Sequence, residues 1–374
     1  MTSRRRFIET LTFGNPDRVP FDPGHPREST LAAWRTQGLA EDVDYLDHLV
    51  EILKIEMPAS PTAEGLGVDF RMIPQFEEEV LEHKGGHYIV QDWKGNICEI
   101  SDEFDVTYLR QAKDFVTRRW IKCPVEGRDD WEQIKLRYDV GSEERFPIDF
   151  ADRCKRAADR DYVLGFTLSG PFWQMREWCG FEGLCIMMIE QPDLVAEMAE
   201  FYRSFIAEML RKVLSRVVPE YIHLSEDMAY KAKAMISPEM TRRFCKPSWD
   251  CWTKTAKQAG VPIVDMDSDG YVGELIPIWI ESGINVCDPI EVAAHNDMNE
   301  FRSLYGRSMA YRMGVDKRAI AKGGSAIRDE LKRIEPVLTG GGYIPGCDHG
   351  VPSDISWPDF VDYSRLLAEM TGWL

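Results

Sequence analysis

Acidic, imidazole and thiol side chains gather where three short apolar runs of this sequence end. These ends read Ser225-Glu226-Asp227, Asp265-Met266-Asp267-Ser268-Asp269-Gly270 and Cys347-Asp348-His349. A buried carboxylic acid can hold its proton near neutral pH and donate it, and carboxylate, thiolate and imidazole are metal ligands. These three segments are therefore the first candidates for a reactive site.

Three aspartates alternate in the second segment, and on a strand Asp265, Asp267 and Asp269 point to one side. Carboxylates crowded in this way repel one another unless a cation, a proton or hydrogen bonds relieve them. A calcium loop is disfavoured, because Ile276 stands at the twelfth position, where such a loop needs glutamate. The alternative for Asp269 is that it caps the following helix, with Gly270 in the turn.

Cys347 and His349 are spaced so that both can reach one pocket at a strand end. Together with a carboxylate they form a plausible zinc-binding set that leaves one position open for a substrate. Two alternatives remain open: Cys347 is a small buried apolar side chain, and His349 makes a hydrogen bond within a loop.

Five further side chains are expected to bind substrate. His25 and Arg27 follow the first expected strand, and Arg27 is suited to hold a carboxylate, although an ordinary surface role is equally open. Phe172 and Trp173 follow a strand that runs into a small-residue turn, where they either wall a planar substrate or pack in the core. His223 lies within the first of the three apolar runs.

Alternating β-like runs and amphipathic helices must position these residues. The expected strands are 19–22, 69–73, 162–168, 221–224, 261–266, 284–286, 309–313 and 343–345. The expected helices are 4–13, 30–37, 42–53, 192–214, 238–259, 274–281, 327–338 and 359–370. Repeated βα units require right-handed crossovers and a parallel sheet, so we predict a (β/α)8 barrel over residues 1–374 in preference to an open doubly wound sheet. Gly85-Gly86 and the turn at 93–97 indicate a small antiparallel β insertion within residues 71–125.

Composition limits the classes of function. The 374 residues include 45 Lys and Arg against 63 Asp and Glu, a net charge of −18, which makes nucleic acid and anionic membranes poor partners. No apolar stretch is long enough to span a bilayer, and Glu9 interrupts the run that a signal peptide needs. Nine cysteines without a CxxC pair indicate reduced thiols. We expect a cytoplasmic enzyme that acts on a small molecule, and a homodimer stays open.

The order of the motifs resembles the uroporphyrinogen decarboxylase superfamily over nearly the whole chain. The matching segments are Arg4-Arg5-Arg6-Phe7, Asn15-Pro16-Asp17-Arg18-Val19-Pro20, Gly165-Phe166 with Gly170-Pro171-Phe172, Ser237-Pro238-Glu239-Met240 with Phe244 and Pro247, and Gly342-Tyr343-Ile344-Pro345 with Asp348-His349. The resemblance implies one distorted barrel whose active site is a cleft at the carboxyl ends of the strands.

Two activities in that superfamily compete. The decarboxylase removes acetate carboxyls from a tetrapyrrole without a cofactor and uses an arginine-rich motif, Arg-Gln-Ala-Gly-Arg-Tyr. The corresponding segment here, residues 20–27, contains only Arg27, which is little positive charge for a substrate with many carboxylates. Corrinoid-dependent methyltransferases instead move a methyl group between a small compound and a cobalamin-carrying partner protein.

Methyltransferases of this branch that resemble the coenzyme M enzymes bind zinc through a His-x-Cys motif and a late cysteine. Asp267 and Asp269 occupy the first two of these positions here, and Cys347 occupies the last. The resemblance therefore implies zinc on Asp267, Asp269 and Cys347, with two oxygen ligands in place of nitrogen and sulfur, and a corrinoid protein as partner.

We expect a methyltransferase that takes a methyl group from a small ether or amine, aromatic or not, and gives it to a corrinoid. Glu226 or Asp267 would donate a proton to the leaving group if no metal is bound. The alternative is a cofactor-free decarboxylase with Asp267 or Glu226 as the acid and Arg27 as the anchor. A third hypothesis is a barrel that only binds a tetrapyrrole or corrinoid.

Overall fold

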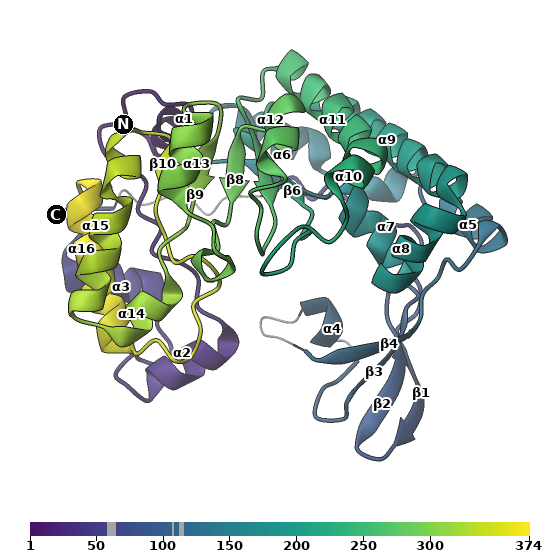
Figure 1. Ribbon diagram of the computed structural model, residues 1–374, viewed down its shortest axis with the longest axis horizontal. Helices are drawn as coiled ribbons and strands as arrows, with labels where there is room; N and C mark the ends of the chain where they lie inside the picture. Colours follow the sequence, from purple (N-terminus) through teal and green to yellow (C-terminus); the bar gives the residue numbers. More distant parts are fainter. Residues whose placement is uncertain (58–64, 107, 112–115) are drawn as a thin grey trace.

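Six parallel strands form the centre of the computed structural model, which describes residues 1–57, 65–106, 108–111 and 116–374. The strand order is β10-β9-β8-β7-β6-β5. Their bounds are β5 (Gly165–Ser169), β6 (Tyr221–Ser225), β7 (Ile263–Asp267), β8 (Val286–Asp288), β9 (Ala310–Arg312) and β10 (Tyr343–Ile344). Each overlaps one of the six strands expected between residues 162 and 345, so these six predictions are confirmed (Figure 1).

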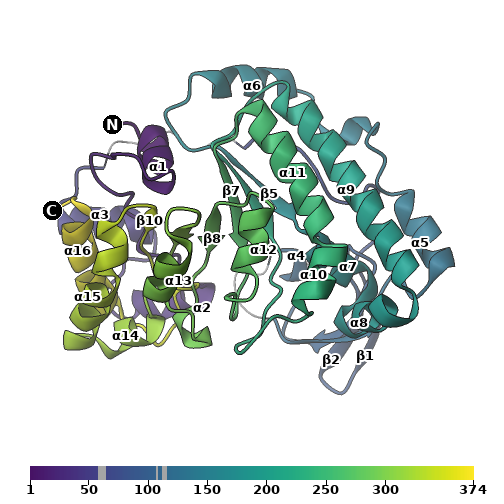
Figure 2. The same cartoon turned by 45° about the horizontal axis from the view of Figure 1, so that its top comes forward.

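Helices connect the strands and cover the outer face of the sheet. They are α7 (Pro171–Cys179), α8 (Phe181–Glu190), α9 (Pro192–Leu214), α10 (Pro238–Phe244), α11 (Lys246–Ala259), α12 (Ile276–Glu281), α13 (Met298–Tyr305), α14 (Lys317–Lys322), α15 (Ser325–Thr339) and α16 (Trp357–Thr371), with short 3-10 turns at Glu143–Arg145 and Val292–Ala294. Figure 2 shows α9 and α11 side by side outside β5 and β7. The helix expected over 238–259 is interrupted at Cys245, because Pro247 has no N–H to continue the helical ladder.

The N-terminal part adds α1 (Ser3–Leu11), α2 (Glu28–Arg35) and α3 (Tyr45–Leu53), and α5 (Arg128–Lys135) and α6 (Phe150–Ala158) precede β5. No helix in the described ranges combines the length and the apolar character that crossing a bilayer requires. The core lies mainly between the sheet and these helices, where outward-facing strand residues such as Leu224 and Met266 are fully buried.

The segment 19–22, expected as a strand, has no regular strand structure, and this corrects the predicted strand count. Pro20, Pro23 and Pro26 lack the N–H that a strand must donate to its neighbour. The following residues still lie beside the loop after β10, since Cys347 N donates to Pro23 O at 3.2 Å and Val351 N to His25 O at 2.9 Å.

Residues 69–73, expected as a second additional strand, are also not a strand, because the fully buried Arg145 occupies their carbonyl groups. Its guanidinium donates to Asp69 O at 3.2 Å and to Arg71 O at 2.8 Å, and Ile73 N donates to Arg137 O at 2.7 Å. A carbonyl held by a side chain is not available to a neighbouring strand. The described residues therefore form a six-stranded parallel sheet and not a closed ring of eight strands.

The predicted antiparallel insertion is confirmed as a four-stranded sheet that projects beside α7 and α8 (Figure 1). Its strands are β1 (Glu79–Lys84), β2 (His87–Gln91), β3 (Ile97–Ser101) and β4 (Arg118–Lys122), and α4 (Tyr108–Gln111) precedes β4. Gly85 and Gly86 form the first turn with φ values of 62° and 79°, a conformation that glycine adopts without strain. Positions 107 and 112–115 of the insertion lie outside the described residues.

One end of the parallel sheet is closed by α1. Phe7 and Leu11 pack against inward-facing residues near the amino ends of the strands, namely Ile263, Val286, Ala310 and Ile344. Because α1 covers the amino ends of the strands with apolar side chains, a ligand can approach only from the carboxyl ends.

Candidate active site

Polar side chains, in place of the usual apolar ones, line the inner face of the sheet near the carboxyl ends of its strands. Ser169, Ser225, Asp267 and Asp288 are successive partners across β5 to β8, and Thr167, His223 and Asp265 form the row below. Residues paired across neighbouring strands point to the same face. Barrel interiors are normally filled with branched apolar side chains, so two polar rows at the carboxyl ends indicate a site for chemistry.

His223 lies between two carboxylates at the centre of these rows. Its Nδ1 is 3.2 Å from Asp265 Oδ2 and its Nε2 is 3.6 Å from Asp267 Oδ2. Burial disfavours the charged ring, but the hydrogen bonds and charges of these two aspartates outweigh burial and raise the pKa of His223 to about 10. His223 is therefore a charged imidazolium at neutral pH.

Arg312 joins the aspartates of neighbouring strands. Its Nη1 donates to Asp265 Oδ2 at 2.9 Å and to Asp288 Oδ2 at 2.8 Å, and its Nη2 lies 3.9 Å from Asp22 Oδ2. Burial raises the pKa of Asp288 to about 7 against the opposing effect of Arg312. The Oδ1 atoms of Asp265 and Asp288 are buried without a hydrogen-bond partner among the described residues. Asp288 lines the cleft and Asp265 does not, so the carboxyl group of Asp288 is the one of the two that a ligand can approach.

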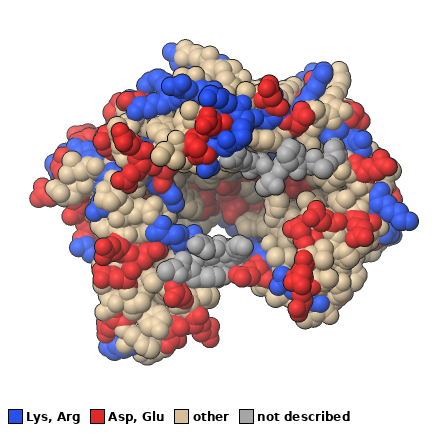
Figure 3. All heavy atoms as spheres, turned by 180° about the vertical axis from the view of Figure 1, so that it is seen from behind, with Lys and Arg blue, Asp and Glu red and all other residues tan. Residues whose placement is uncertain are grey.

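A cleft of about 270 Å³ opens onto this network, and its wall combines the strand ends with the loop after β10. It is lined by His223, Asp267, Asp269, Asp288, Pro289, Met313, His349 and Gly350. Asp267 is 33% exposed and His223 is 17% exposed, so a small molecule in the cleft can reach both. Seen from behind, the molecule is hollowed at its centre, with acidic side chains at the hollow (Figure 3).

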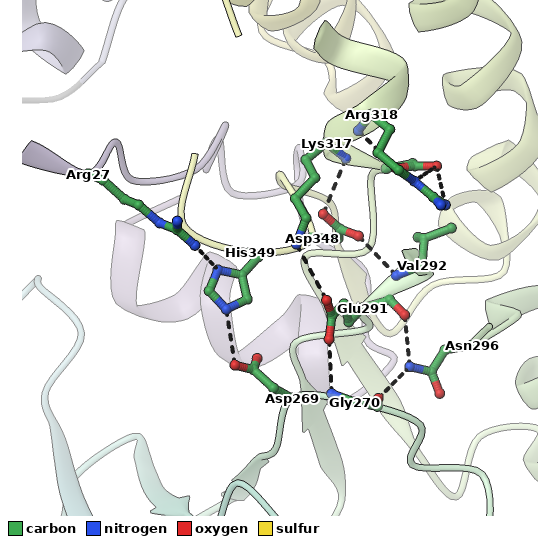
Figure 4. A network of polar contacts seen from close by, with 11 residues as sticks. Arg27, Asp269, Gly270, Glu291, Val292, Asn296, Lys317, Arg318, Asp348 and His349 are labelled. Carbon is green, nitrogen blue, oxygen red and sulfur yellow. Dashed lines mark hydrogen bonds and ion pairs between the residues drawn. The ribbon is translucent and has the colours of Figure 1, made fainter. Parts of the chain in front are cut away.

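At the rim of the cleft, His349 bridges the N-terminal segment and the loop after β7 (Figure 4). Arg27 Nη2 is 3.2 Å from His349 Nδ1, and His349 Nε2 is 3.0 Å from Asp269 Oδ2. Arginine can only donate, so Nδ1 accepts, and Nε2 carries the proton that is donated to Asp269. Asp269 also raises the pKa of His349. The predicted residues Arg27, Asp269 and His349 thus meet in one chain of hydrogen bonds.

Neighbouring loops are fixed by two further carboxylates (Figure 4). Glu291 accepts the Gly270 N–H at 3.0 Å and pairs with Lys317 at 3.4 Å. Asp348 accepts the backbone N–H groups of Val292 at 2.9 Å and of Lys317 at 3.2 Å, and burial raises its pKa to about 6. These contacts hold the loops after β7, β8 and β10 together around the cleft.

Glu226, expected as a proton donor, lies outside the cleft. Side chains alternate along β6, so with His223 inside the sheet, Glu226 points to the outer face. It is fully buried beneath the start of α7, where its oxygens accept the Trp173 N–H at 3.0 Å and the Trp249 indole N–H at 2.7 Å. Burial raises the pKa of Glu226 to about 8. A catalytic role for Glu226 stays a prediction that these contacts do not support.

The three ligands expected for zinc do not come together. Cys347 is fully buried against Gly24, and burial raises the pKa of its thiol to about 12. Among the described residues, the one group of three ligand atoms within 4.8 Å of each other belongs to His223, Asp265 and Asp288. Arg312 already bonds one oxygen of each of these two aspartates, so a zinc ion there would lie beside a fixed cation. Neither set of residues fits zinc.

The expected substrate-binding aromatics separate in the structure. Phe172 is fully buried in the core, which is the alternative left open for it. Trp173 lines a second cavity, and Arg176 lies 4.5 Å above its ring. His25 is 72% exposed and its Nδ1 is 3.1 Å from the Tyr45 hydroxyl, outside the set of cleft-lining residues.

Sequence reasoning missed Arg312 and Asp288, although a signal for both was present. Asp288 follows the expected strand 284–286, and Arg312 lies near the end of the expected strand 309–313. Each is two residues after an inward-facing residue, Val286 or Ala310. The same rule that selected Asp267 would have selected both.

A parallel sheet with outer helices and a polar cleft at the strand ends places the chain among α/β proteins with barrel-like strand order. A solved structure with this fold is a methyltransferase from Methanosarcina mazei, which is 13% identical, covers 99% of this chain and 98% of that chain, and has a TM-score of 0.60. At this identity the similarity concerns the fold alone.

Two other solved structures are similar over a shorter part of the chain. A B12-independent methionine synthase from Shewanella sp. W3-18-1 is 10% identical over 59% of this chain and 64% of that chain, with a TM-score of 0.37. A putative vitamin-B12 independent methionine synthase from Listeria monocytogenes is 11% identical over 60% and 67%, with a TM-score of 0.34. No family model and no curated protein sequence matches this chain.

Proposed function

We propose that this chain is a methyltransferase that takes a methyl group from a small ether or amine and passes it to the corrinoid of a partner protein. The single observation that carries the proposal is the position of His223 as a charged acid at the wall of a cleft, held between Asp265 and Asp267. The fold shared with a protein described as a methyltransferase adds support.

His223 is the proton donor in this proposal. A reduced corrinoid on the partner protein would supply the nucleophile that accepts the methyl group. As the bond from methyl to an ether oxygen breaks, the oxygen takes the electron pair and receives the proton of His223 Nε2. An amine donor enters already protonated as a methylammonium, so its nitrogen takes the electron pair and leaves as a neutral amine without a proton from His223. With a pKa of about 10, His223 carries its proton at neutral pH, so the acid form is populated before the bond breaks.

Asp265 and Arg312 position this acid. Asp265 accepts from His223 Nδ1 and so directs Nε2 toward Asp267 and the cleft. Arg312 holds Asp265 and Asp288 in place from the next strands. Asp267 stabilises the imidazolium. It is the more exposed of the two aspartates that contact His223, so the leaving group can displace it from His223 or bind to it.

Decarboxylation of a substrate with several carboxylates has less support. Asp267, Asp269 and Asp288 line the cleft, and like charges there would repel such a substrate. The guanidinium of Arg312 is already bonded to two aspartates, so it is not available as an anchor. The convergence of an acid and its positioning groups also favours catalysis over binding alone.

The test is methyl transfer from a panel of methyl ethers and methylamines to free, chemically reduced cobalamin, followed by its absorbance. We expect His223→Gln to lower the rate with methyl ethers about 100- to 10,000-fold. His48→Gln is the matched control, because His48 lies on α3 and is not among the cleft residues. The wild-type rate should fall as the pH rises through about 10, the pKa of His223.

Asp265→Asn should move that fall to lower pH, because it removes the main partner that raises the pKa of His223. A wild-type rate in His223→Gln would refute the proposed acid. Release of carbon dioxide from a carboxylated substrate, without methyl transfer, would refute the proposed reaction.

A further inference from the structure

A second cavity lies between the antiparallel sheet and α7, apart from the acidic cleft. Its volume is about 190 Å³, and it shares no lining residue with the cleft. The residues that line it are Arg71, Met72, Trp93, Lys94, Tyr138, Ser169, Trp173, Gln174, Glu177 and Trp178. Trp93 and Lys94 come from the turn between β2 and β3, and Lys94 forms an ion pair with Glu177 of α7 across the cavity mouth.

Aromatic rings form most of the apolar wall, contributed by Trp93, Tyr138, Trp173 and Trp178. Flat rings of this kind pack against another planar ring in offset or edge-to-face geometry. An apolar cavity of about 150 Å³ accommodates benzene. A cavity of about 190 Å³ therefore has room for one ring with one small substituent.

The polar groups of this cavity are mainly donors. Gln174 lines the cavity and is only 6% exposed, and its side-chain amide supplies an N–H donor. The Tyr138 hydroxyl accepts from the Trp178 indole at 3.0 Å, so its own proton remains available to donate.

The charged groups agree with this donor character. Arg71 uses Nε and Nη2 to bind Asp69, at 2.9 and 2.8 Å, which leaves Nη1 for a ligand. The carboxylate that lines the cavity, Glu177, is already paired with Lys94. A ligand with a planar acceptor group can accept hydrogen bonds from these donors, including the Gln174 amide.

We propose that this cavity is a binding site for a small aromatic carboxylate. The ring fills the space between the tryptophans, and the carboxylate accepts hydrogen bonds from the Gln174, Tyr138 and Arg71 donors. Ser169 of the polar row on β5 to β8 also lines this cavity, but the proposal does not use the reaction proposed for the cleft, so its test is separate.

The test is isothermal titration calorimetry of the full chain with benzoate, compared with cyclohexanecarboxylate, which lacks the aromatic ring, and benzylammonium, which reverses the charge. We expect benzoate to bind most tightly. Trp173→Leu and Gln174→Leu should each weaken benzoate binding about five- to thirtyfold. Trp120→Leu is the control, because Trp120 is 49% exposed on β4 and does not line the cavity.

Thermal unfolding of each variant checks that the fold is kept. Arg71→Gln is a further variant, and it should also weaken benzoate binding. Arg71 is 53% exposed, so this substitution does not disturb core packing. The proposal is overturned if benzoate does not bind saturably, if benzylammonium binds more tightly than benzoate, or if folded Trp173→Leu and Arg71→Gln bind benzoate as well as Trp120→Leu does.

Discussion

Replacing Glu226 by glutamine tests whether this buried carboxyl group serves the fold or the chemistry. Glu226 is fully buried, and burial raises its pKa from 4.5 to about 8, although the N–H groups of Trp173 and Trp249 act in the opposite direction. The folded protein therefore holds the proton of Glu226 at neutral pH, whereas the unfolded chain releases it.

The sign of the pH effect follows from this difference. The folded state binds the proton more tightly, so the protein loses stability as the pH rises from 4.5 to about 8. At about 1.4 kcal/mol for each pH unit, this span corresponds to at most about 5 kcal/mol. Glutamine cannot ionise, but its NH2 group replaces one of the two oxygens that accept the Trp173 and Trp249 N–H groups, so one of these donors then faces another donor. We therefore expect Glu226→Gln to be less stable than the wild type near pH 5, and the wild type to lose several kcal/mol relative to the variant between pH 5 and pH 9.

Urea unfolding followed by tryptophan fluorescence, at both pH values and for both proteins, measures this difference. Comparing variant with wild type cancels the titration of Asp288 and His223. Glu239→Gln is the control, because Glu239 is exposed on α10. The reasoning is refuted if the wild type and Glu226→Gln change stability equally between the two pH values. If Glu226→Gln instead unfolds like the wild type but has lost methyl transfer, the result would support the sequence-based prediction that Glu226 is the proton donor.

Three other substitutions test the structure around the site. Arg312→Met leaves buried Asp288 without its cation and Asp265 with His223 alone, and it should lower the free energy of unfolding in urea by about 3–5 kcal/mol. Arg318→Met is the control, because Arg318 is 55% exposed, and it should cost less than about 1 kcal/mol. Gly170→Ala places a Cβ 2.0 Å from the Glu226 carboxyl carbon and should cost about 1–3 kcal/mol in thermal unfolding. Gly183→Ala is the control, because a Cβ there meets no atom within 4 Å and alanine suits the interior of α8, so it should not destabilise the protein. Cys347→Ala and treatment with a chelator should each leave methyl transfer nearly unchanged, because the buried thiol does not reach the cleft; joint loss of zinc and activity would revive the metal hypothesis.

Sequence patterns predicted six strands because each is a short apolar run next to a helix with a clear amphipathic pattern. The two remaining expected strands failed for reasons that local patterns do not show. The prolines of 19–27 remove strand donors, and this was visible in the sequence. The carbonyls of 69–71 are bound by Arg145, which is distant in sequence, and only the folded chain brings it there.

The candidate site was predictable to the extent that side chains alternate along strands. Asp267, His223 and the rim residue His349 converge as the strand-end rule predicts. The same alternation, carried one residue further along β6, assigns Glu226 to the outer face, so its placement could have been derived. The partnership of Arg312 with aspartates on two other strands could not be derived, because it depends on which strands are neighbours and on their register.

Arg312 also determines whether the cleft releases a proton from Asp288 when a ligand binds. It binds one oxygen of Asp265 and one of Asp288, and so provides the positive charge that a metal ion would otherwise supply. The remaining oxygen of Asp288 has no partner in the described chain, and its carboxyl group has a pKa of about 7. A methylammonium donor that bonds to this oxygen would favour the charged carboxylate and expel its proton, whereas a neutral ether would not. The protonation of Asp288 therefore separates the two donor classes that the sequence alone left open.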